Sequence, residues 1–209
     1  MTNGERISPT TSSDISVAEN NLPQVISNEH TERVLSLYGE FPSFMAAFNP
    51  SNAHHFAVNP ERCVSGISPS LKLLCDTYGY NKICLWIAGI IGNINLMSLG
   101  DNPEKKMNSA QIVDCAESIV SNYSALKAAE IMLFLSRVKA GKYGKFYGVI
   151  DGMAICNFLN DYCEERKELL RIAHAKLQKS QQEKNRQMIE EFEKFKKTLE
   201  YAESQINQK

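Results

Sequence analysis

The sequence predicts an all-α protein, with a helical domain of about five to six helices followed by a long C-terminal helical extension. Between residues 31 and 177, apolar residues recur mostly at the three- and four-residue spacing of a buried helix face. Helix-breaking residues then stop, because no proline follows residue 103 and no glycine follows residue 152. Of the 209 residues, 43% are hydrophobic and 22% are charged, which leaves enough apolar material for a packed core.

Composition divides the chain into three segments. Residues 1–30 hold twelve Ser, Thr or Asn residues and no aromatic residue. So little apolar surface cannot offset the entropy cost of ordering, and we predict a disordered N-terminal tail. The helical domain is predicted over 31–177, and a helical tail with coiled-coil character over 178–209.

The first part of the domain is predicted from its aromatic residues. A short helix over 31–38 precedes three aromatic residues at helical spacing, Phe41, Phe44 and Phe48. Such a stripe is typical of a helix that packs on its own domain, although it also suits a peptide that docks into a partner's groove. Residues 49–69 contain three prolines and a glycine and are predicted to be irregular.

Capping residues place the later helices. Ser68 before Pro69 predicts a helix start, as do Asn108, with Gln111 at the reciprocal capping position, and Ser124. The helix near 82–98 is apolar almost all round and is predicted to be central. We predict helices at about 69–78, 82–98, 109–122 and 125–139, and a long helix from 151 to the C-terminus.

The lack of a secretory signal, the short apolar runs and the cysteine spacing favour a cytoplasmic protein without a membrane segment. Residues 1–30 lack the apolar region of a secretory signal. The uninterrupted apolar run 83–91 is far shorter than the roughly 20 residues of a membrane span. The six cysteines include no CxxC pair, so reduced thiols are expected.

A basic and aromatic loop is the candidate for nucleic-acid binding. No acidic residue lies between Glu130 and Asp151, whereas lysines alternate there with rings and glycines. Lysines neutralise phosphates and rings stack on bases, which suits single strands. The alternative is a tight connection whose rings fill the core while its lysines point to water. The predicted nucleic-acid site comprises Arg137, Lys139, Lys142, Tyr143, Lys145 and Tyr147.

The sequence contains no recognisable set of residues for metal binding or catalysis. His54, His55 and Cys63 form one ligand-like cluster, but no second ligand pair accompanies them, and we predict no metal or other cofactor. A catalytic nucleophile needs a base and an orienting group, and no such set is recognisable. Glu130 is the one acid in an apolar run, and we expect it to pair with Lys127 or Arg137 on its own helix. The prediction is therefore a protein that is not an enzyme.

The C-terminal segment carries a heptad seam. Met188, Phe192, Phe195, Leu199, Ala202 and Ile206 recur at steps of four, three, four, three and four residues. We predict self-association through Met188, Phe192, Phe195 and Leu199. The alternative is a helix that packs back on its own domain.

Residues 107–166 resemble an uncharacterised helical family of Bacteroides-type phages and mobile elements. The shared pattern is "MN..QI", then "Y..LK..E..L...R.K.G.YG.FY", then "Y..ER". Here it comprises Met107, Asn108, Gln111, Ile112, Tyr123, Leu126, Lys127, Glu130, Arg137, Lys139, Gly141, Tyr143, Gly144, Phe146, Tyr147, Tyr162, Glu165 and Arg166.

That family is similar to helicase-loader and primosome-accessory proteins. The resemblance implies a non-enzymatic DNA-replication accessory protein that contacts single-stranded DNA or a replicative helicase. The alternative function is a helical protein–protein adaptor with no nucleic-acid contact.

Overall fold

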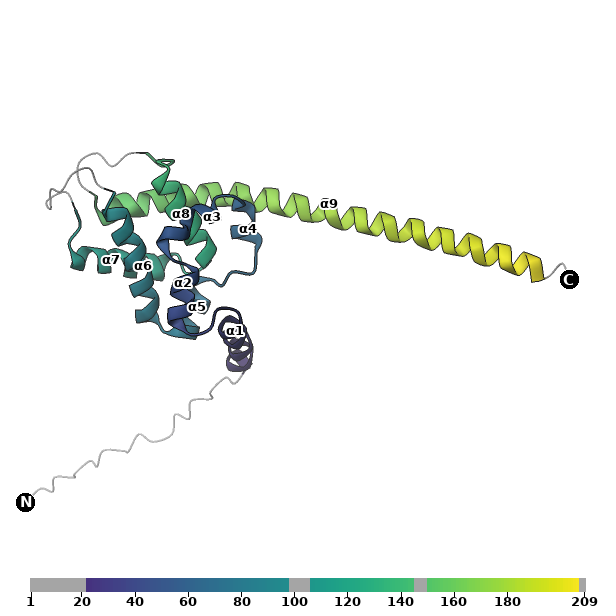
Figure 1. Ribbon diagram of the computed structural model, residues 1–209, viewed down its shortest axis with the longest axis horizontal. Coiled ribbons are helices and arrows are strands. Elements are labelled where there is room, and N and C mark those ends of the chain that lie inside the picture. The colour runs from purple at the N-terminus through teal and green to yellow at the C-terminus, as the bar shows by residue number, and fades with distance from the viewer. Residues whose placement is uncertain (1–21, 98–105, 145–149, 207–209) are drawn as a thin grey trace, which may run out of the picture.

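The structure, a computed structural model, describes residues 22–97, 106–144 and 150–206. A compact head of helices lies at one end of a single long helix, α9, which projects far beyond the head (Figure 1). The helices are α1 (Leu22–Tyr38), α2 (Phe41–Ala47), η1 (Pro50–Asn52), α3 (Ala53–Phe56), α4 (Pro60–Ser65), α5 (Leu71–Tyr78), α6 (Tyr80–Asn95), α7 (Ser109–Asn122), α8 (Ala128–Lys139) and α9 (Gly152–Ile206).

The prediction of an all-α protein with a long C-terminal helix is confirmed. Within the described residues, β pairing is limited to one isolated bridge between Ser70 and Lys127. No helix in that part of the chain has the length and apolar content that a membrane span requires.

Helices α6 and α8 form the centre of the head. Every residue of α8 from Ala128 to Leu135 is buried, and α6 buries Trp86 as well as all of its isoleucines. Helices α5 and α7 pack on α6, and α3, α4 and α9 pack on α8. Helix α6 is not covered all round, because Leu85 lies on a side that remains exposed. The expected central position of the helix near 82–98 agrees with this arrangement.

The first helix begins earlier than predicted. Helix α1 begins at Leu22, within the segment 1–30 for which the sequence predicts a disordered tail. Residues 1–21 lie outside the described residues. Helix α1 packs against α2 and α5, and Val34 is its buried contact with the core.

The aromatic stripe packs inside its own domain. Phe44 and Phe48 are buried, and their rings meet Trp86 at centroid distances of 5.1 and 6.1 Å. The indole nitrogen of Trp86 also donates to the carbonyl oxygen of Phe48. These contacts support the packing interpretation of the stripe. The segment 49–69 is less irregular than predicted, because three short helices, η1, α3 and α4, lie within it.

Two of the predicted caps are displaced and one is confirmed. The backbone N–H of Gln111 donates to Asn108 Oδ1, and the backbone N–H of Asn108 donates to Gln111 Oε1, as predicted. Ser70, not Ser68, caps α5, and α8 begins after Lys127 rather than Ser124. A backbone pairing between the two chain segments explains the displacement, since the segment before α5 and the segment before α8 hydrogen-bond to each other.

Helix α9 has two different environments. Its first turns pack on α4, α7 and α8 and bury Ile155, Leu159 and Tyr162. Residues 174–200 are all exposed, and an ion pair between Lys176 and Glu61 lies at the start of this stretch. At 1.5 Å per residue, this exposed part is roughly 40 Å long.

Candidate functional site

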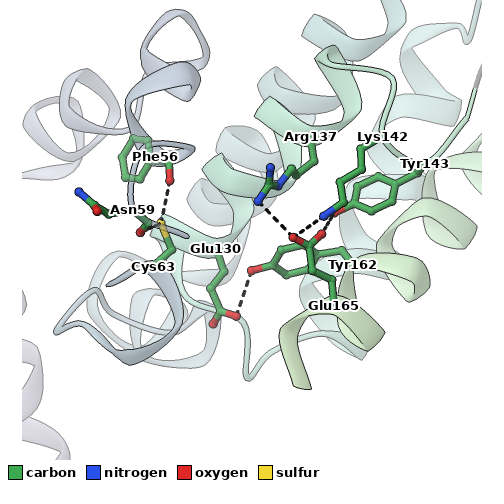
Figure 2. Close-up of polar contacts among 9 residues, drawn as sticks. All are labelled: Phe56, Asn59, Cys63, Glu130, Arg137, Lys142, Tyr143, Tyr162 and Glu165. Carbon is green, nitrogen blue, oxygen red and sulfur yellow. Dashed lines mark hydrogen bonds and ion pairs between the residues drawn. The ribbon is translucent and has the colours of Figure 1, made fainter. Parts of the chain in front are cut away.

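A polar junction fastens the base of α9 to α8. It comprises Lys127, Glu130, Arg137, Lys142, Tyr143, Tyr162, Glu165 and Arg166. Most of these side chains converge on two carboxylates, Glu130 of α8 and Glu165 of α9 (Figure 2).

Glu130 is fully buried and has three donors. Its Oε1 accepts from the Tyr162 hydroxyl at 3.2 Å and from Arg166 Nε at 2.6 Å, while its Oε2 accepts from the backbone amide of Lys127 at 3.0 Å. The expectation that Glu130 forms an ion pair with Lys127 or Arg137 is therefore wrong, because its ion-pair partner is Arg166. The counter-ion comes from α9, because α9 packs on α8 and covers the side on which Glu130 lies.

Glu165 gathers the basic loop. Arg137 Nη2 lies 3.2 Å and Lys142 Nζ 2.6 Å from its Oε1, and the Tyr143 hydroxyl donates to its Oε2 at 2.8 Å. Burial alone would raise the pKa of Glu165, but the hydrogen bonds from Lys142 and Tyr143 and the charge of Arg137 outweigh it and hold the pKa below its usual value. Glu165 therefore stays ionised in the junction.

The two tyrosine hydroxyls act as donors. Burial raises the pKa of Tyr162, and the neighbouring Glu130 raises it further. Burial likewise raises the pKa of Tyr143, with Glu165 adding to the effect. Both phenols remain protonated at neutral pH, so each can donate to its carboxylate.

Lys127 connects α8 to the end of α4. Its Nζ donates to the carbonyl oxygens of Val64 and Gly66, at 2.8 and 2.7 Å. These carbonyls lie at the C-terminal end of α4, where a cation is favoured by the unpaired acceptors and the helix dipole. The Lys127 ammonium thus supplies donors to carbonyl oxygens at the end of α4 that have no partner within that helix.

Cys63 borders the junction without being a reactive thiol. Its Sγ donates to the carbonyl oxygen of Phe56 at 3.3 Å (Figure 2). Burial raises the pKa of Cys63 to about 11, with the Glu130 charge adding to the effect and Arg137 opposing it. Nucleophilic cysteines have lowered pKa values, so this thiol behaves as a buried small side chain.

The contacts of the junction hold α9 against the head. Two grooves of about 420 and 660 Å³ lie near the junction; Lys127 lines the larger one, but Glu130 and Glu165 line neither. A buried carboxylate that already accepts from three donors has little capacity left for a substrate. Its geometry fixes α9 on the head, since loss of one partner of a buried ion pair is costly.

The described residues of the predicted nucleic-acid site do not form an open basic patch, because they are bonded within the protein. Arg137 and Lys142 are ion-paired to Glu165, and Lys139 donates to the carbonyl oxygen of Pro50. Although no acidic residue lies between Glu130 and Asp151 in the sequence, Glu165 of α9 offsets two of these cations. Lys145 and Tyr147 lie outside the described residues.

Tyr143 has the position of a core-filling ring. Its ring stacks on Phe134 at 6.0 Å and lies 6.2 Å from Phe158. With its hydroxyl bonded to Glu165, both the face and the tip of Tyr143 are engaged within the protein. These contacts favour the tight-connection alternative at this residue, and a role of the loop in nucleic-acid binding stays a prediction.

The ligand-like cluster is used for local contacts. The His54 and His55 rings lie 3.9 Å apart, and His54 Nδ1 lies 3.2 Å from the carbonyl oxygen of Ser51. Within the part of the chain that the structure describes, no group of three or more His, Cys, Asp or Glu side chains is arranged to hold a metal ion.

The predicted seam residues lie on the projecting part of α9. Phe192 is 67% exposed and Phe195 60% exposed, and the neighbouring seam residues Met188 and Leu199 are also exposed. The seam does not pack back on the head, so that alternative is wrong for these four residues.

Residues 106–204 match the model of a family of unknown function, DUF6633. The matched segment is somewhat less than half of the chain and comprises α7, α8 and most of α9. It therefore contains all eight residues of the polar junction. Neither a curated protein nor a solved structure matches the chain.

The sequence did not identify Glu165, Tyr162 and Arg166 as junction residues, although they appear in the pattern of the resemblance. A signal was present, because Glu165 and Arg166 follow Tyr162 by three and four residues, the spacings at which side chains are neighbours on a helix surface. What the sequence lacked was the relative placement of α8 and α9, which brings opposite charges together across the two helices.

Proposed function

We propose that the protein is a helical adaptor, without enzymatic activity, that presents its head on a helical arm and self-associates through that arm. The observation that carries the proposal is the exposed seam of Met188, Phe192, Phe195 and Leu199 on the part of α9 beyond the head. Contiguous exposed apolar side chains on a helix indicate a contact surface.

The energetics of the arm support a partner. An isolated helix gains little stability in water, and a helix in a folded protein is stabilised mainly by the packing of its apolar face. From Arg186 to Glu200 the arm is exposed, and ion pairs such as those of Arg186 with Glu183 and Glu190 join residues three or four positions apart. Burial of two phenylalanines in a helix–helix contact would supply the missing packing.

The polar junction supports the same function from the other end. Two donors from α9 on Glu130, and three donors from α8 and the following residues on Glu165, fix the direction of α9 relative to the head. A partner that binds the arm is then held at a defined distance from the head surface, which is what a scaffold requires.

The mass of the full-length chain in solution tests this proposal. Changing Phe192 and Phe195 to Glu places two charges in the seam, so light scattering should show a shift from an oligomer to a monomer. The matched control Gln187→Glu/Lys194→Gln makes the same change in net charge on the outer face of the helix and should leave the oligomer intact. A wild-type protein that is monomeric at high micromolar concentration would refute self-association.

A second candidate is the DNA-replication accessory function that the resemblance implies. The observation that favours it is the exposure of Lys139, the last residue of α8, and of Lys142 in the turn that follows, which has 42% of its side chain accessible despite its ion pair. A phosphate could compete with Glu165 for Lys142. The ion pairs already present make this the weaker of the two proposals.

Binding of fluorescent single-stranded DNA at low salt tests the second candidate. If Lys142 and Lys145 bind phosphates, changing both to Ala should lower affinity and reduce the salt dependence by about one for each phosphate that is no longer neutralised. Tyr143→Ala separates the two interpretations of that ring. A stacking role predicts weaker DNA binding with unchanged thermal stability, whereas the observed packing predicts lower stability with unchanged binding. Absence of binding by the wild type would leave the adaptor alone.

A further inference from the structure

We infer that the arm pairs with a second copy of the chain as a parallel, in-register, two-stranded coiled coil that contains Asn185 in its seam. The inference rests on the proposed self-association and adds the orientation and the register. It follows from the heptad frame of the exposed arm, from the charges beside the seam and from one polar residue within it.

The heptad frame follows from the step lengths. In a coiled coil, position a is followed by d after three residues and d by the next a after four. Phe192 and Phe195 are three apart and Leu199 follows four later, so Phe192 and Leu199 occupy a, and Phe195 and Met188 occupy d. All four are exposed on one helix, which leaves this face open for a partner.

Asn185 occupies the a position one heptad before Phe192. It is exposed on the arm, and it precedes Met188 by the three residues that separate a from d. An asparagine at a faces its own copy only when two helices are parallel and in register, where the two amides can hydrogen-bond to each other. Any other alignment sets a desolvated amide opposite an apolar residue and leaves it unpaired.

Charges beside the seam favour the same alignment. In this frame Glu191 occupies g and Lys196 occupies e. A parallel in-register pair places g of one helix beside e of the other five residues later, so Glu191 faces Lys196 of the second copy, and symmetry repeats the pair. In an antiparallel pair that keeps the phenylalanines together, g faces g, and Glu191 then lies opposite Thr198.

The parallel orientation has a consequence for the heads. Both heads lie at the same end of the paired arms, separated from the start of the seam by the polar segment 178–184. This segment is roughly 10 Å long as a helix and has no apolar residue that would force the two chains together. Two identical head surfaces are therefore presented side by side, which raises the avidity for a partner that carries two matching sites.

Disulfide cross-linking of the full-length chain tests the orientation. Met188→Cys and Leu199→Cys each place a thiol in the seam, eleven residues apart. A parallel in-register pair predicts that each variant links to itself under mild oxidation and that an equimolar mixture gives little 188-to-199 link. Gln187→Cys, on the outer face, and the parent chain with its six cysteines serve as controls and should not link, with peptide mapping to assign the bonds.

The outcomes separate the orientation from self-association itself. Predominant 188-to-199 links in the mixture, with neither variant linked to itself, would show an antiparallel pair. A dimer by light scattering in which neither kind of link forms would show that the seam is elsewhere, and both results overturn the inference. A monomeric wild type refutes the proposed function instead. In a parallel dimer, Asn185→Leu should raise the melting temperature of the pair and increase the share of misaligned 188-to-199 links.

Discussion

The two halves of α9 are parts of one uninterrupted helix, yet they are stabilised by different means. The first half buries Leu159 and Tyr162 against the head and forms ion pairs with residues far away in the sequence. Residues 174–200 of the second half are exposed, and the ion pairs beyond Lys176 join residues three or four positions apart. Helix formation alone therefore does not distinguish a structural helix from an interaction surface.

Burial decides how much each charge matters. Arg166 pairs with a carboxylate that has no access to solvent, whereas Arg171, five residues later, pairs with the exposed Glu168. Water and salt screen the second pair, and they cannot reach the carboxylate of the first. The same residue type thus holds the head together at one position and contributes mainly solubility at the other.

The largest expected effect contrasts these two arginines. Arg166→Met leaves Glu130 buried without its counter-ion and should lower the free energy of unfolding by about 3 kcal/mol. Arg171→Met makes the same chemical change on the exposed side of the helix and should leave stability nearly unchanged. Urea unfolding followed by circular dichroism measures both. Equal losses for the two variants would contradict a structural role of the polar junction.

The sequence predicts those features that depend on neighbours along the chain. The capping pair of Asn108 and Gln111, the apolar helix around Trp86 and the long helix after Asp151 all follow from local spacing, and the structure has all three. The exposed seam was also recognisable, because a heptad repeat is a property of one helix.

The sequence fails where a distant segment changes the outcome. Ser68 and Ser124 are good capping residues, but pairing of the two segments shifts both helix starts to later residues. The basic loop looks uncompensated between Glu130 and Asp151, since its counter-charge, Glu165, comes from a helix that begins after the loop. Local patterns do not contain the packing of α8 against α9, and most of the candidate site depends on that packing.

The smallest expected effect concerns the pH dependence of Glu165. Because its pKa is held below the usual value in the folded protein, Glu165 stabilises the fold above the pKa of an unfolded glutamate, near 4.5, and this contribution is lost as the pH falls through the lowered pKa. Lys142→Met removes one of the groups that lower the pKa. The loss of stability between pH 6 and pH 3 should then be smaller than in the wild type, by less than about 1 kcal/mol because Lys142 is partly exposed. Lys139→Met removes a neighbouring charge that does not contact Glu165 and should keep the wild-type pH profile. Identical profiles for wild type and Lys142→Met would show that this ion pair does not form in solution, and Lys142 would then be free to bind phosphate, as the nucleic-acid proposal requires.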